Sequence, residues 1–138
     1  MTAAEARRRF GAAGVARLAT VDARGQPHLV PIVFALERET IYSVVDTKPK
    51  HTVELKRLQN VRSNPRVSLL VDHYDDCDWG TLWWVRADGV GRVLEAADAE
   101  ARTAMRLLAE RHPQQRPAGP VLAVDVKRWS AWSARGAG

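Results

Sequence analysis

The sequence contains little cysteine and no long apolar run. Cys77 is the only cysteine among 138 residues, which excludes an internal disulfide framework and a cysteine-rich zinc site. No uninterrupted apolar segment approaches the roughly 20 residues that a membrane-spanning helix requires. The arginines at positions 7–9 precede alanines and glycines rather than the sustained apolar stretch of a signal peptide. We therefore expect a cytoplasmic protein that has no membrane partner.

The sequence also lacks the short motifs of several enzyme classes. It has no G-x-S-x-G, no H-E-x-x-H and no Walker sequence, so hydrolytic and nucleoside-triphosphate chemistry have no support. The acidic segment from Asp72 to Asp78 lacks the glycine and the terminal glutamate of a calcium-binding loop. We interpret this segment as a solvated turn and expect no metal site.

Short β-type segments dominate the chain. They cover residues 16–21, 28–36, 40–45, 66–72, 82–88, 89–94 and 121–132. Helical patterns occur at only three places, namely residues 2–11, a stretch of about ten residues that ends before Asn64-Pro65, and residues 97–111. We expect segment 40–45 to turn back against segment 28–36. Segments 82–88 and 89–94 should pair with each other, with Gly89 and Gly91 marking a turn or a bulge.

These elements indicate one domain over residues 1–138. With 46% hydrophobic and 27% charged residues, the composition is that of a compact globular chain. Strands so frequent in so short a chain favour a mostly β fold with α insertions. We expect an antiparallel barrel of about six or seven strands, because closing a barrel removes exposed strand edges.

The positive charge is concentrated between residues 47 and 66. This segment has a single acid, Glu54, and the following basic residues: Lys48, Lys50, Lys56, Arg57, Arg62 and Arg66. Its excess of basic over acidic residues equals the formal net charge of the chain, +5. The cations lie where a strand leads into a helix, and a helix N-terminus already favours an anion. We therefore predict a phosphate site, while a solvated basic helix face remains the alternative.

Several runs of residues resemble a known family. They are L-A-T-V-D-A-R-G-Q-P-H, V-P-I-V-F and K-R-L-Q-N-V-R-S-N-P-R-V-S-L-L-V-D. Together they resemble the split β-barrel flavin- and deazaflavin-binding proteins, the class that contains the pyridoxamine-phosphate oxidases. The runs Y-S-V-V-D-T-K-P-K and L-W-W-V-R-A-D-G, and Y-D-D followed by D-W, are similar to the branch that uses coenzyme F420, a deazaflavin.

The resemblance implies roles for particular residues. The basic residue that opens the helix before the N-P turn holds the cofactor phosphate in this family, which indicates Arg57, with Lys56 beside it. Lys48 and Lys50 would suit the phosphate and the acidic tail of the deazaflavin. The planar ring would lie against two strand segments and near one polar neighbour. These are Val30, Pro31, Ile32 and Val33 of the second strand, Val45, Asp46 and Thr47 at the end of the third, and Asn60.

The family also forms homodimers in which both subunits line each pocket. Trp83 and Trp84 are adjacent in an expected strand, so their side chains point to opposite faces. One ring could therefore contact cofactor or substrate, with Arg86 on the same face as Trp84, and dimer packing is the alternative. His28 or His51 could donate a proton, although a structural role is more common for a histidine.

The resemblance and the charge pattern together predict a function. We expect a homodimeric oxidoreductase that transfers a hydride from reduced F420 to an unsaturated or quinone-like small molecule, with no catalytic residue assignable. An FMN-dependent oxidase, or a flavin or deazaflavin carrier, is the alternative on the same fold. A nucleic-acid-binding barrel is disfavoured, because the aromatic residues are not interleaved with the cations.

Overall fold

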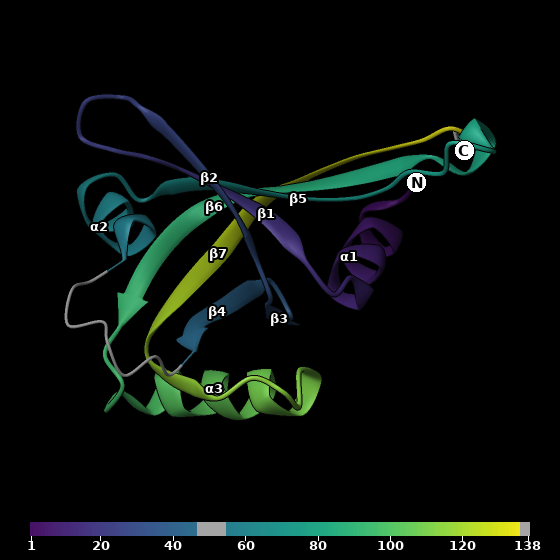
Figure 1. Cartoon of the computed structure of the whole chain (residues 1–138). Coiled ribbons are helices and arrows are strands. Elements are labelled where there is room, and N and C mark those ends of the chain that lie inside the picture. The colour runs from purple at the N-terminus through teal and green to yellow at the C-terminus, as the bar shows by residue number, and fades with distance from the viewer. Residues whose placement is uncertain (47–54, 136–138) are drawn as a thin grey trace.

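The computed structural model describes residues 1–46 and 55–135. The elements are α1 (Ala3–Ala12), β1 (Ala16–Val21), β2 (Pro27–Ile32), β3 (Ala35–Glu37), β4 (Thr40–Asp46), α2 (Lys56–Ser63), β5 (Arg66–His73), the 3₁₀ turn η1 (Trp79–Thr81), β6 (Trp83–Leu94), α3 (Ala99–Arg111) and β7 (Pro117–Ser133). Within the described residues, the strands form one seven-stranded antiparallel sheet in the order β2-β1-β5-β6-β7-β4-β3 (Figure 1). The expected mostly β fold with helical insertions is confirmed.

The segment expected as one strand over residues 28–36 forms two strands. Only Val33 and Phe34 separate β2 from β3, yet the two strands lie at opposite edges of the sheet order. A connection this short spans about 10 Å at most, so the sheet must curl until its edges lie close together, as in a barrel. The strand β4 pairs with β3 and β7. β4 therefore turns back against β3, which holds the end of the strand expected over residues 28–36, and not against β2.

Residues 83–94 form one long strand, so the predicted pairing of segments 82–88 and 89–94 is wrong. β6 pairs along its length with β5 on one side and β7 on the other. The glycines do mark an irregularity, because the register with β7 shifts between Asp88 and Gly89. A Cβ atom at Gly89 would collide with the carbonyl oxygen of Asp125. Gly89 therefore permits a bulge, which bends the strand without reversing it.

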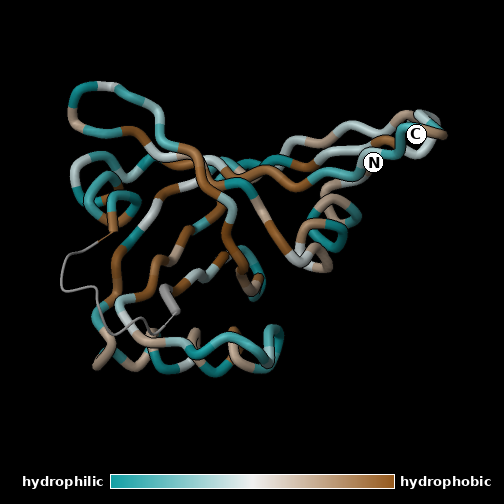
Figure 2. The backbone as a smooth tube through the Cα atoms, in the orientation of Figure 1, coloured by the Kyte–Doolittle hydropathy of each residue, from teal (hydrophilic) through white to brown (hydrophobic). Residues whose placement is uncertain are grey.

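The helices are placed by their own sequence signals and by the core. Thr2 caps α1 by accepting a hydrogen bond from the amide of Glu5 at 3.1 Å. The ring of Phe10, fully buried, lies 5.0 Å from Phe34 and 5.3 Å from Trp129. Figure 2 shows hydrophobic stretches along the central strands. None of the helices in the described segments is long and apolar enough to cross a bilayer.

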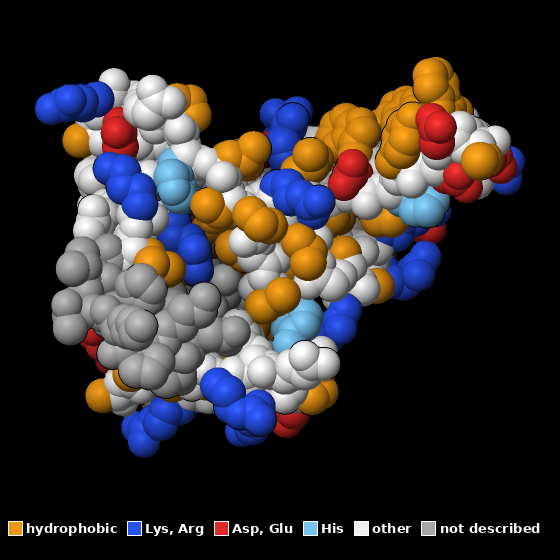
Figure 3. Space-filling view, viewed as in Figure 1, with side chains coloured by type: hydrophobic (Ala, Val, Ile, Leu, Met, Phe, Trp, Pro, Cys, Tyr) orange, Lys and Arg blue, Asp and Glu red, His pale blue; other side chains and the backbone are white. Residues whose placement is uncertain are grey.

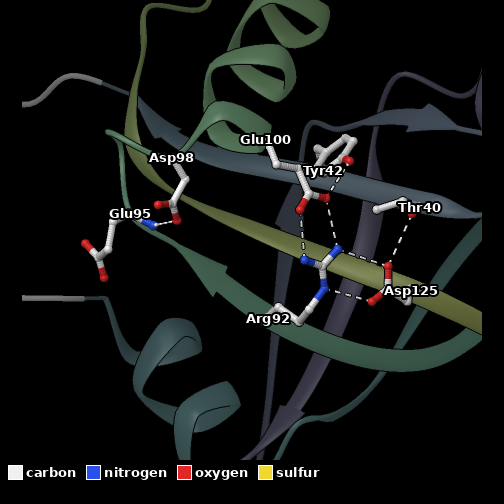
Figure 4. Close-up of polar contacts among 7 residues, drawn as sticks. All are labelled: Thr40, Tyr42, Arg92, Glu95, Asp98, Glu100 and Asp125. Carbon is white, nitrogen blue, oxygen red and sulfur yellow. Dashed lines mark hydrogen bonds and ion pairs between the residues drawn. The ribbon is translucent and has the colours of Figure 1, made fainter.

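An ion-pair network fixes α3 to the barrel. Arg92 on β6 donates two hydrogen bonds to Glu100 of α3, both at 2.9 Å, and also contacts Asp125 of β7 at 2.8 and 3.1 Å (Figure 4). Tyr42 donates to Glu100 at 2.8 Å, and Thr40 donates to Asp125 at 3.2 Å. Hydrogen bonding to Arg92 lowers the pKa of Glu100, and burial raises the pKa of Tyr42 to about 12. The network joins β4, β6, β7 and α3.

Helices α1 and α2 cover one side of the layer formed by β1, β5, β6 and β7, where Phe10 and Leu58 join the core. Helix α3 packs on the other side, against the ends of β6 and β7 at Leu94, Val121 and Ala123. Leu18, Leu69 and Val85 are buried on the side that α1 and α2 cover. The opposite side, here called the outer face, carries the cross-strand row Arg17, Leu70, Arg86 and Ser130. β5, β6 and β7 extend beyond the body of the barrel as an arm that ends near η1.

Candidate functional site

The N-terminus of α2 carries cations where most helices carry acids. Its first turn begins with Lys56 and Arg57 and contains no acidic residue, and the N-cap residue Leu55 makes no side-chain capping bond. The amide groups at this end and the helix dipole favour negative charge. Two cations without a capping acid among the described residues therefore make this end of α2 suited to an anion.

Arg57 is the strongest individual feature of this end of α2. Its side chain is partly buried, and burial lowers the pKa of its guanidinium. No residue in the described ranges makes a hydrogen bond or ion pair with it, whereas the Lys56 ammonium lies 3.9 Å from Asp22. A guanidinium that is withdrawn from water without a counter-charge is costly. An anionic ligand would offset that cost.

Asn60 holds α2 in place. Its side chain is buried, and its Nδ2 donates to Oγ1 of Thr20 on β1 at 3.0 Å. Thr20 is equally buried. Because Arg57 precedes Asn60 by three residues, the two side chains share a helix face. The structure thus places Asn60 in the interior, one helical turn from the predicted phosphate-binding residue Arg57, and its direct contact with a planar ring stays a prediction.

The predicted ring-binding residues of the second strand lie at a sheet edge. Within β2, Val30 is half-buried, Pro31 is exposed and Ile32 is buried. β2 is an edge strand, so among the described strands only β1 pairs with it, and Pro31 is tolerated there because an edge position does not require its N–H group. The predicted residue Val33 lies in the short link to β3.

The predicted residues at the end of the third strand lie partly within β4. Val45 and Asp46 pair with Ala118 and Pro117 after a register shift next to Val44. Thr47, Lys48, Lys50 and His51 lie outside the described residues. The predicted cation cluster is therefore described only from α2 onward.

Two buried polar atoms in the described part of the chain have no hydrogen-bond partner. They are Nδ1 of His28 on β2 and Oε1 of Gln115, which precedes β7. Gln115 is 7% exposed, and its Nε2 donates to the carbonyl oxygen of Val44 at 3.3 Å. Sequence reasoning missed Gln115, because a glutamine in a polar loop carries no distinguishing signal. Unpaired buried polar atoms are rare in folded proteins and fit a site that a ligand completes.

Trp84 and Arg86 lie on the outer face, away from α2. The Arg86 guanidinium lies 5.8 Å from the ring centroid of Trp84 and 3.1 Å from Asp88. With Leu70 and Trp132, they line a hollow of about 330 Å³. Val90 pairs with the first residue of β5, just after α2, and six strand residues from Trp84 to Val90 span about 20 Å. Within one chain the structure does not bring this pair to Arg57.

A second hollow, of about 480 Å³, lies on the outer face nearer to α2. Its lining includes Ala19, Arg66, Ser68, Asp88 and Lys127. Figure 3 shows Lys and Arg side chains on the molecular surface near α2 and the β1–β2 hairpin. In the described portion of the chain, no group of three or more His, Cys, Asp or Glu side chains could hold a metal ion.

Comparison with known sequences finds one family and one curated relative. Residues 2–133 match the family described as pyridoxamine 5′-phosphate oxidase. A 5a,11a-dehydrotetracycline/5a,11a-dehydrooxytetracycline reductase of Streptomyces rimosus subsp. rimosus is 31% identical over 91 residues. That alignment covers 66% of this chain and 63% of the reductase, so the chain spans less than two thirds of that relative's length.

Solved structures share the fold along nearly the whole chain. A conserved hypothetical protein of Mycobacterium tuberculosis superposes with a TM-score of 0.75 at 25% identity, covering 98% of this chain and 86% of that one. An FAD-binding protein of Mesorhizobium loti superposes with a TM-score of 0.71 at 22% identity, covering 95% and 94%. At such identities the likeness shows the architecture.

Proposed function

The chain belongs to the pyridoxamine 5′-phosphate oxidase family, and from this premise we propose that it is an F420-dependent oxidoreductase. It transfers a hydride from reduced F420 to an unsaturated or quinone-like organic acceptor. The family is named for an oxidase and the curated relative for a reductase, and both names support redox chemistry. The reductase acts on dehydro compounds, which supports an unsaturated acceptor.

The observation that carries the proposal is Arg57 at the start of α2, which is partly buried and has no hydrogen-bond or ion-pair partner among the described residues. An arginine binds a phosphate through two parallel hydrogen bonds, and its planar fork fixes the position of the group. Backbone amides at the start of α2, where Leu55 makes no side-chain capping bond, would add donors to the same anion. Arg57 and these amides would hold the cofactor phosphate, and Lys56 would add charge beside it.

The choice of a deazaflavin over FMN follows from the amount of charge. F420 carries an acidic tail in addition to its phosphate, so it calls for more cations than FMN does. Lys48 and Lys50 of the sequence would supply them, and a lysine suits a variable tail because its ammonium is a mobile point charge. A flavin, FMN or FAD, is the alternative ligand for the same site.

β2, β4 and α2 each contribute differently to the proposed cofactor site. When bound, the deazaflavin supplies the hydride chemistry. The edge strand β2 at Val30–Ile32 and the end of β4 would bound the slot for the ring and exclude water from it. Asn60 keeps α2 and its cations at a fixed distance from β1 through Thr20.

A second copy of the chain is the proposed protein partner. On the outer face, toward the arm and away from α3, Leu70 and Trp132 are 37% and 49% exposed. Exposed apolar patches of this kind mark interaction surfaces. A partner's arm would bring Trp84 and Arg86 to the cofactor site that they do not reach within one chain. A sedimentation mass equal to that of one 15.3 kDa chain, with cofactor bound, would overturn this arrangement.

Titration of the purified protein with F420 and with FMN tests the function. We expect quenching of deazaflavin fluorescence with a lower Kd than for FMN, followed by oxidation of reduced F420 when quinones or conjugated enones are added. Tighter FMN binding and a yellow protein as isolated would contradict the deazaflavin assignment. F420 binding without turnover of any acceptor would indicate a carrier. Binding of single-stranded nucleic acid that weakens steeply with salt would favour the nucleic-acid reading.

A further inference from the structure

His28 occupies an unusual place on the edge strand β2. Side chains alternate along β2, so His28 shares a face with Val30 and Ile32, the face that turns toward the core. Its ring is partly buried, and its Nδ1 atom is fully buried with no hydrogen-bond partner among the described residues. A polar atom that is removed from water without gaining a hydrogen bond in the protein is energetically unfavourable.

His28 belongs to a continuous polar row that leads to Arg57. In the β1–β2 register, His28 is the direct partner of Thr20, and directly opposed side chains lie about 5 Å apart at their Cβ atoms. Thr20 in turn accepts the hydrogen bond from Asn60 of α2. Asn60 and Arg57 share a helix face. The row therefore runs from β2 across β1 to α2, and within the described residues neither Nδ1 of His28 nor the Arg57 guanidinium has a hydrogen-bond partner.

His112, in contrast to His28, has a structural role. Nε2 of His112 lies 2.7 Å from the carbonyl oxygen of Phe34. That contact satisfies the ring and links the end of α3 to the segment between β2 and β3. His28 has no equivalent contact among the residues described, so the fold alone does not account for a polar ring at this position.

We propose that His28 is a binding residue for the oxyanion that Arg57 holds. The ligand class is a phosphoryl or carboxylate group, and the inference rests on the proposed function in taking that group to belong to the redox cofactor. Because Nδ1 is out of contact with solvent, the ring must turn about χ2, a torsion with two broad, roughly equivalent positions. A half-turn exchanges Nδ1 with Cδ2 and lets the nitrogen donate to a ligand oxygen. Arg57 and His28 then grip the anion from two elements.

Substitutions that replace only one of the two ring nitrogens of His28 at a time test this proposal. Asparagine places an amide atom near the position of Nδ1, whereas glutamine places one near that of Nε2. We expect His28→Phe to raise the Kd for F420 roughly tenfold, as for a lost hydrogen bond to a charged group. His28→Asn should stay within about threefold of the wild type, and His28→Gln should resemble His28→Phe.

Thermal stability distinguishes a ligand-binding role of His28 from a purely structural one, because the two roles predict opposite changes in the thermal midpoint. His28→Phe removes an unsatisfied buried nitrogen, so its thermal midpoint without ligand should equal or exceed that of the wild type. The matched control His112→Phe loses the contact with Phe34 and should unfold at a lower temperature with an unchanged Kd. If His28→Phe binds as tightly as the wild type, or is destabilised as much as His112→Phe, the proposal is overturned.

The outcome can be separated from that of the proposed function. If F420 binds and His28→Phe leaves the Kd unchanged, the function stands and the role of His28 fails. If the wild type binds neither F420 nor FMN, the function fails and titration with inorganic pyrophosphate decides the role of His28. Weaker pyrophosphate binding by His28→Phe, with binding kept by His28→Asn, would support it. Equal binding by all variants, or no binding by the wild type, would overturn it.

Discussion

Nδ2 of Asn60 donates a hydrogen bond to Oγ1 of Thr20 across 3.0 Å, and each residue is only 1% exposed. This contact joins α2 to β1 in the interior of the barrel. It matters for the site because Arg57 lies one helical turn from Asn60. A buried hydrogen bond between two side chains thus sets where the cations of α2 point.

We expect Asn60→Ala to lower the free energy of unfolding by about 1–3 kcal/mol, because it leaves the buried Thr20 hydroxyl unpaired. Thr20→Val should cost a similar amount by leaving the Asn60 amide unpaired. The double variant with Thr20→Val and Asn60→Ala removes both polar groups, so it should cost less than the sum of the two single changes. Urea unfolding of the four proteins measures this coupling, and additive effects would show that the pair is not coupled.

Arg57→Ala should weaken cofactor binding by roughly 1.5–3 kcal/mol, through loss of a charge-assisted contact with phosphate. The free energy of unfolding without ligand should not fall, because the change removes a partly buried charge that has no described partner. Fluorescence titration and urea unfolding measure the two effects. Arg106→Ala, an exposed arginine on α3, is the matched control for net charge. An Arg57→Ala protein with wild-type affinity would remove Arg57 from the site.

Gly89→Ala should destabilise the protein by about 1–3 kcal/mol, because overpacking forces the surrounding backbone to shift. The added Cβ would collide with the carbonyl oxygen of Asp125 at the bulge in β6. Gly14→Ala is the control, since a Cβ there meets nothing within 4 Å, and it should be neutral or slightly stabilising. Thermal unfolding of both variants compares them, and equal midpoints would contradict the tight packing at the bulge.

Stability should depend on pH through the Arg92 network. The pKa of Glu100 is lowered from 4.5, chiefly by hydrogen bonding to Arg92, so the folded state favours the carboxylate. Its contribution is present above about pH 4.5 and is lost as the pH falls through the lowered value. For Tyr42, with a pKa raised from 10.0 to about 12, the contribution is present below pH 10 and is lost as the pH rises toward 12.

We therefore expect the thermal midpoint to fall at both ends of this pH range. Glu100→Gln keeps the shape of the side chain and removes its charge, so it should flatten the acid side of the profile. Tyr42→Phe should flatten the alkaline side. Midpoints recorded across the range check both variants, and an acid limb that persists unchanged in Glu100→Gln would assign it to other carboxylates.

The secondary structure was predictable wherever local patterns decide it. The cap at Thr2, the breaker Asn64-Pro65 and the apolar face of α3 led to helices close to those observed. The split of segment 28–36 was not predictable, because Val33 and Phe34 continue the apolar run. Only the closure of the sheet forces the chain to leave one edge and join the other at that point.

The glycines of β6 show the same limit. Gly89 and Gly91 indicated a turn or a bulge, and local sequence could not choose between them. Pairing with β5 on one side and β7 on the other keeps β6 extended through Gly89, so the glycine forms a bulge and not a turn. Long-range pairing therefore overrode a local turn signal.

The sequence by itself determined the fold class, the family and the position of the cations at the start of α2, because period-two patterns, helix breakers and charge clusters are local properties of a chain. Tertiary structure alone decided which polar groups lack partners. Arg57 and His28 were already candidates from the sequence, but their burial without a partner among the described residues, like that of Oε1 of Gln115, is set by residues that are distant in sequence. The same is true of the distance between Trp84 and Arg57, which depends on how far the arm extends from the barrel.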